Sequence, residues 1–148
     1  MKQSYKVLAV ILAGTAVLMA LKVSQQKAQP ETMSLVPMMR LLLSDMYTID
    51  EGIYTENFEM IEKGGTAVSD HPVMTEDDKK LVKSALGEDM KKFVNFDKIV
   101  HHHADSIAAA AHNEKMSEVL RHYRIVQQGC VDCHTGFRTQ IIEARANN

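Results

Sequence analysis

The spacing of apolar residues is the feature that most constrains the fold of this chain. Between Leu35 and Ile53 they recur at positions 35, 39, 42, 46, 49 and 53, a 4-3-4-3-4 pattern that places them along one side of a helix. Similar apolar seams run through residues 58–68, 93–110 and 116–137. Four amphipathic helices joined by short connections predict an all-α fold, an antiparallel four-helix bundle.

The connections between these helices follow from the residues that interrupt the pattern. Residues 69–76 are predicted to form a loop, and residues 77–86 a short helix that Gly87 ends. Gly64 and Gly65 fall inside the second long helix, where each glycine costs about 1 kcal/mol relative to alanine. We therefore expect these glycines to weaken the second helix.

The pentapeptide Cys130-Val131-Asp132-Cys133-His134 is a C-x-x-C-H motif, which is typical of c-type haem attachment. Two thiols at this spacing can each add to one vinyl group of a porphyrin, and the following histidine can ligate the iron. These are the only two cysteines, so a zinc site would lack further ligands, and a thioredoxin-like motif would lack its βαβ context. A disulfide would leave His134 without a role. The motif predicts one covalently bound haem, with thioethers at Cys130 and Cys133 and His134 as the proximal iron ligand.

The N-terminal 28 residues have the pattern of an export signal. Two lysines precede an apolar run over residues 7–21, which is somewhat short for a membrane-spanning helix. Residues 22–28 contain no clear cleavage site, so the segment is either removed, which we prefer, or retained as a membrane anchor. Residues 29–148 then form one domain with a formal charge of −6, because four of the 17 basic and none of the 19 acidic residues precede it. We expect a periplasmic protein that does not bind nucleic acid.

Both cysteines lie on the apolar seam of the fourth helix. We therefore expect the haem inside the bundle, near the end where that helix terminates. In an up-down-up-down bundle, this end also holds the start of the first helix, the end of the second and the start of the third. Residues near 39, 71 and 93–96 should approach the porphyrin, and Phe93 or Phe96 should lie nearest to it.

The segment CVDCHTGFR, residues 130–138, on the last of four predicted helices resembles the C-terminal motif of the cytochrome c′ family. The resemblance extends from about residue 33 to residue 144, although only the C-terminal motif is highly specific. It implies that Arg138 lies close to the haem and that the distal haem face is lined from an early turn of the first helix. Low-spin members place an iron-ligating methionine there, and the segment around Met39 resembles that type.

Met39 is the preferred sixth iron ligand because it lies on the apolar seam at the haem end of the first helix. Met38 is expected to point to the side of that seam, and Met46 lies roughly 10 Å further along the helix. Met38 and His71 remain alternatives, as does an open distal site. Methionines at helical spacing commonly fill cores, and a loop histidine is commonly solvated.

Three consecutive histidines, His101, His102 and His103, suggest metal binding at first sight. Consecutive residues on a helix point in different directions, so the three cannot converge on one ion. Only His103 is expected to face inward, as an ordinary core histidine.

Two functions fit these expectations. A six-coordinate haem with histidine and methionine ligands transfers single electrons, since thioether ligation favours ferrous iron. The alternative is a five-coordinate haem that binds a small gas such as nitric oxide or carbon monoxide, and a membrane-tethered haem sensor is a weaker third. No hydrolase or nucleotide-binding motif is present, so we expect no enzymatic activity. Redox proteins are the expected partners, the membrane is contacted only through residues 7–21 if they are retained, and a homodimer is left open.

Overall fold

The computed structural model describes residues 31–147, so the predicted signal or anchor over residues 1–28 lies outside the described part of the chain. In chain order the elements are β1 (Thr32–Met33), α2 (Leu35–Tyr54), α3 (Phe58–Ser69), β2 (Val73–Met74), α4 (Glu76–Leu86), η1 (Gly87–Asp89), α5 (Met90–His112) and α6 (Met116–Ala146). The prediction of an all-α bundle with four long helices and one short one is confirmed. Among the helices of this range, none has the length and apolarity needed to cross a membrane.

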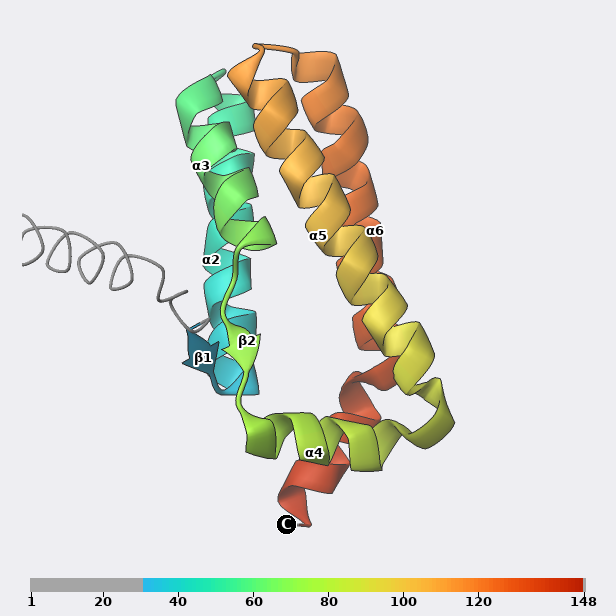
Figure 1. Ribbon diagram of the computed structural model, residues 1–148. Helices are drawn as coiled ribbons and strands as arrows, with labels where there is room; N and C mark the ends of the chain where they lie inside the picture. Colours follow the sequence, from blue (N-terminus) through green and yellow to red (C-terminus); the bar gives the residue numbers. More distant parts are fainter. Residues whose placement is uncertain (1–30, 148) are drawn as a thin grey trace, which may run out of the picture. The chain divides into compact units, whose positions relative to one another are not determined.

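The long helices form two antiparallel hairpins, α2–α3 and α5–α6 (Figure 1). Helix α3 packs against both α2 and α5, and α5 packs along α6. Figure 1 shows the hairpins close together at the end that holds the turn between α5 and α6. They diverge toward the opposite end, where α4 runs crosswise and contacts α6. The end where α6 terminates therefore also holds the starts of α2 and α5, as predicted. The prediction that the second helix ends there is wrong: α3 has 12 residues against 20 in α2, and it stops partway along α2, so β2 carries the chain to this end (Figure 1).

Local side-chain chemistry defines the ends of the shorter helices. The Asn57 side chain accepts a hydrogen bond from the Met60 N–H at the start of α3 (3.0 Å), and Thr75 accepts one from the Asp78 N–H at the start of α4 (3.3 Å). Acidic residues fill the first turn of α4, where the helix dipole favours negative charge. Gly87 ends α4 with a φ of +51°, a backbone conformation that glycine adopts without a steric cost.

The segment predicted as a loop over residues 69–76 contains a short strand. Strands β1 and β2 pair in parallel, with Thr32 opposite Val73 and Met33 opposite Met74. Because each strand has only two residues, no alternating apolar pattern marks it in the sequence. The pairing fixes the chain just before α2 to the connection between α3 and α4.

The apolar interior is divided into two clusters along the helices. The turn-end core lies toward the α5–α6 turn and contains Ile49, Ile61, Val68, Ala104, Ile107, Ala110, Ala111, Val119, Tyr123 and Val126. The α4-end core contains Leu35, Met38, Val82, Leu86, Phe137 and Ile141. Helices α2 and α6 contribute buried residues to both clusters and so connect them.

The glycines of α3 permit close helix packing. A Cβ added to Gly64 would lie 2.7 Å from Ile49 Cγ1 and 3.0 Å from the Ile49 backbone nitrogen of α2. A Cβ on Gly65 would lie 2.9 Å from the Ala108 nitrogen of α5. These glycines lower the helix propensity of α3, but they let its backbone approach those of α2 and α5 closely. A residue with a Cβ would not fit at either position.

Candidate cofactor-binding site

The C-x-x-C-H motif lies within the uninterrupted helix α6. Residues at positions i, i+3 and i+4 of a helix are neighbours on one surface. Cys130, Cys133 and His134 have this spacing, so two thiols and one imidazole are presented by the same side of α6. Both thiols are free and half-buried.

The two cysteines stand at the junction of the two apolar clusters. Cys130 packs against the turn-end core, and Cys133 packs against the α4-end core. The predicted seam of the fourth helix is confirmed, because the other residues along it are buried or half-buried: Met116, Val119, Tyr123, Val126 and Phe137.

Burial also governs the protonation of the thiols. It raises the pKa of the Cys130 thiol, and burial together with the negative charges of Cys130 and Asp97 raises the pKa of Cys133 to about 11. Catalytic and redox-active cysteines depend on a lowered pKa, because the thiolate is the reactive form. The environment of this pair is therefore unlike that of a thioredoxin-type dithiol.

His134 is exposed although it lies on the core-facing side of α6. It follows Cys130 by four residues and precedes Phe137 by three and Ile141 by seven, and all of these spacings keep residues on one helix surface. Phe137 and Ile141 are both buried. At the level of His134, by contrast, the protein itself does not cover the imidazole.

Aromatic side chains from α5 pack against the part of α6 that follows the C-x-x-C-H motif. Phe93 and Phe96 both pack edge-on against Phe137, with ring centroids 6.0 and 6.1 Å apart. These two residues and Cys133 all pack against the α4-end core. Arg138, four residues after His134, is exposed.

The methionines of α2 are arranged differently from the prediction. Met38 is only 3% exposed, so the expectation that it points to the side of the seam is wrong. Met39 is half-buried and packs against the same α4-end core as Cys133. The buried residues of α2 are Leu35, Met38, Ile49 and Gly52, which follow a 3-4 spacing in place of the predicted 4-3 spacing. Position 38 therefore lies on the buried side of the helix, and Met39 lies beside it. Met46 packs against the turn-end core, further along α2, in agreement with the prediction.

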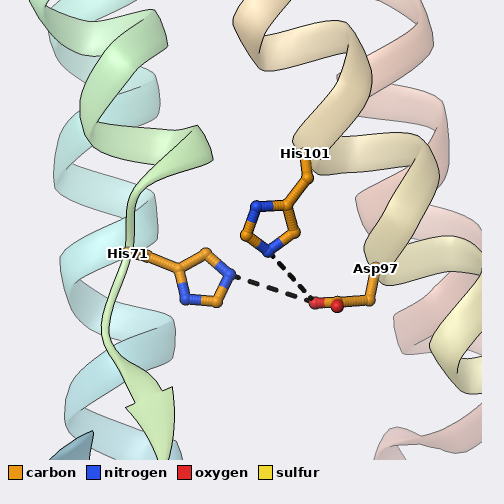
Figure 2. Close-up of side chains that lie close together, drawn as sticks. All are labelled: His71, Asp97 and His101. Carbon is orange, nitrogen blue, oxygen red and sulfur yellow. Dashed lines mark ion pairs between the residues drawn. The ribbon is translucent and has the colours of Figure 1, made fainter. Parts of the chain in front are cut away.

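A second cluster of potential ligands joins the α3–β2 connection to α5. Figure 2 shows His71 reaching from the connection toward Asp97 and His101 on α5. Asp97 Oδ1 lies 3.9 Å from His71 Nε2 and 3.7 Å from His101 Nε2, and the two imidazole rings are 4.5 Å apart between centroids. The only sequence signal for this cluster is the i, i+4 spacing of Asp97 and His101, which does not identify His71 as their neighbour.

The three consecutive histidines do not converge, as predicted, but more than one of them is partly buried. His103 Nδ1 lies 2.7 Å from Nδ1 of His122 on α6, and burial lowers the pKa of both imidazoles. His101 instead faces the end of α3, so the expectation that only His103 points inward is wrong. His102 is exposed.

Comparison with known proteins finds no matching family model, no matching curated protein and no matching solved structure. The resemblance to the cytochrome c′ family therefore stays a prediction from the sequence, whose specific part is the motif at residues 130–138.

Proposed function

We propose that this chain binds one haem covalently through Cys130 and Cys133, with His134 as the proximal iron ligand, and transfers single electrons. The observation that carries the proposal is the presentation of both thiols and the imidazole by one side of α6. No other pair of thiols competes for this role, since the chain has only two cysteines.

The surroundings of the motif fit a porphyrin. Its thiols border two apolar clusters, and the aromatic residues Phe93, Phe96 and Phe137 lie in or against the same cluster as Cys133. The exposed imidazole of His134 lies on the core-facing side of its helix, where a flat apolar group attached to the cysteines would cover it. A bound haem would supply reversible one-electron chemistry, and its axial ligands would set the potential.

A methionine is the sixth ligand that the chain offers most readily. Five of the ten methionines gather in or against the α4-end core: Met33, Met38, Met39, Met74 and Met90. Met39 is the proposed ligand, on the resemblance to low-spin cytochromes c′, and Met38 and His71 are the alternatives. A saturated iron leaves no site for a gas, so this concentration of thioethers favours electron transfer over gas binding.

Export to the periplasm completes the proposal, since covalent haem is generally attached on the outer side of the bacterial inner membrane. The full chain should be produced in a host with a c-type haem maturation system and analysed after denaturation. A pyridine haemochrome spectrum of the c type, with the mass of one haem on the polypeptide, is the expected result.

The matched variants are Cys130→Ala with Cys133→Ala, and His134→Ala. The double cysteine variant should lose covalent haem entirely. If the unaltered chain carries no covalent haem under conditions that mature a reference c-type cytochrome, the proposal is wrong.

A further inference from the structure

The cluster of His71, Asp97 and His101 has the dimensions of a metal site. One ligand atom from each residue can be chosen so that all three lie within 4.8 Å of one another. Donor atoms at 2.0–2.1 Å from a tetrahedral zinc ion are about 3.4 Å apart. The two distances from Asp97 Oδ1, 3.7 and 3.9 Å, exceed this by only a few tenths of an ångström.

The hydrogen bonds around the cluster fix the tautomers of both imidazoles. His71 Nδ1 lies 2.8 Å from the Pro72 carbonyl oxygen, and His101 Nδ1 lies 2.5 Å from the Ser69 carbonyl oxygen. A carbonyl only accepts, so both Nδ1 atoms carry the proton and donate it. In a neutral imidazole the other nitrogen, Nε2, then bears a free lone pair.

These lone pairs point at a carboxylate. Both Nε2 atoms face Asp97 Oδ1 (Figure 2) at distances too long for hydrogen bonds. When both imidazoles are neutral, their two Nε2 lone pairs and the Asp97 carboxylate oxygen face one another with no proton between them. A cation placed between them would accept electron pairs from all three atoms. Donation of Nδ1–H to a backbone carbonyl is also the usual outer-shell arrangement of a metal-binding histidine.

We infer that His71 Nε2, Asp97 Oδ1 and His101 Nε2 bind one divalent transition-metal ion, for which we take zinc as the probe. Two imidazoles and one carboxylate are a common ligand set for zinc, and water occupies the fourth position of such three-ligand sites. The site is accessible, because the side chains of Asp97 and His101 are 50% and 34% exposed, while His71 is 9% exposed and held in place. This inference requires that His71 is not the sixth iron ligand, and otherwise it does not depend on haem binding.

The position of the site gives it a structural consequence. His71 belongs to the connection that follows the α2–α3 hairpin, whereas Asp97 and His101 belong to α5 of the other hairpin. A bound ion would therefore crosslink the two hairpins in the region where they diverge (Figure 1). The free energy of binding would add to the stability of the folded state.

Zinc titration by calorimetry tests the inference on the purified chain without a histidine tag, at pH 7.5 and in whichever haem state it is obtained. One ion should bind per chain. His71→Ala, His101→Ala and Asp97→Asn should each weaken the affinity at least about tenfold. The matched controls are His102→Ala and Asp105→Asn, exposed residues of the same helix, which should leave the affinity within about twofold of wild type.

Cobalt(II) absorption separates this site from the thiols. Visible bands of a nitrogen- and oxygen-ligated ion are expected, whereas an intense sulfur-to-cobalt band would place the ion at Cys130 and Cys133 and overturn the inference. Unchanged zinc affinity in the three ligand variants, or no binding at micromolar zinc, would also overturn the inference.

Thermal unfolding in EDTA checks the fold of each variant, and added zinc should raise the midpoint for wild type and His102→Ala but not for His101→Ala. The haemochrome spectrum is read separately on the same samples, so failure of one proposal does not imply failure of the other.

Discussion

The side chain of Asp78, on α4, accepts a hydrogen bond from the backbone N–H of Leu35, the first residue of α2, at 2.7 Å. Its other carboxylate oxygen lies 3.0 Å from Arg145 Nη1 near the end of α6. Ser34, at the N-cap position of α2, makes no capping hydrogen bond through its own side chain. One carboxylate from a distant part of the chain therefore caps α2 and joins three helices at the α4 end.

Replacement of Asp78 by alanine should lower the free energy of unfolding by about 2–3 kcal/mol, because it removes a buried charged acceptor and leaves the Leu35 N–H without a partner. Urea denaturation at pH 7 measures the change. Asp77→Ala is the matched control, since Asp77 is exposed in the same turn, and should cost under about 1 kcal/mol. Equal losses in the two variants would show that Asp78 acts only through the helix dipole.

Gly64 of α3 and Gly136 of α6 should respond oppositely to replacement by alanine. Gly64→Ala should destabilise the protein by about 1–3 kcal/mol, because the new Cβ would meet Ile49 of α2 at 2.7 Å. Gly136→Ala should stabilise it by about 0.5–1 kcal/mol, since an added Cβ meets nothing within 4 Å and alanine favours the helix. Thermal midpoints and urea curves of the two variants test this. A stabilised Gly64→Ala variant would contradict the close packing of α2 on α3.

Tyr123 should make stability depend on pH in the alkaline range. Its hydroxyl donates to Asp50 Oδ1 at 2.7 Å, and burial together with the Asp50 carboxylate raises the pKa of Tyr123 well above its ordinary value. A group whose pKa is raised on folding holds its proton more tightly in the folded state. Its contribution is therefore complete below the unfolded pKa of about 10 and is lost as the pH rises above it.

Tyr123→Phe should lower the free energy of unfolding by about 1–2 kcal/mol at pH 7, because the Asp50 carboxylate loses its donor. The variant should also lose less stability than wild type between about pH 9.5 and 11.5. Urea midpoints at both pH values give the comparison, and parallel pH profiles for the two proteins would exclude a raised Tyr123 pKa.

The sixth iron ligand is tested by optical spectra of oxidised and reduced holoprotein. Wild type should be low-spin, and Met39→Ala should become high-spin because the iron loses its thioether. Met46→Ala, in the turn-end core, should leave the spectrum unchanged. A high-spin Met38→Ala variant with a low-spin Met39→Ala variant would move the assignment to Met38, and a high-spin wild type would support gas binding instead.

The sequence predicts the helices well because each buries one continuous apolar stripe, and a stripe of this kind is a local property. The rotation of a helix about its own axis is less well determined. Met38 and Met39 differ by one position, and packing against α4 and α6 decides which of them is covered. The same limit explains the glycines of α3, whose role is visible only once the backbones of Ile49 and Ala108 are placed beside them.

The His71 cluster could not be predicted for a different reason. Asp97 and His101 are neighbours on one helix, but His71 reaches them from a connection whose path depends on the pairing of β1 with β2. That pairing involves two residues on each side and leaves no periodic signal. The C-x-x-C-H motif could be predicted, by contrast, because a continuous helix is enough to place its two thiols and its imidazole on one surface.

The glycine contacts of α3 imply that the two ends of the bundle differ in how much change in side-chain volume they tolerate. At the end near the α5–α6 turn, backbones touch, so little volume can be added without separating α2, α3 and α5. At the α4 end five methionines lie in or against the apolar cluster, and their unbranched side chains adapt to new shapes at small cost. Repacking for a different cofactor, in evolution or in design, would therefore be tolerated at the methionine-rich end while the glycine-packed end kept the topology.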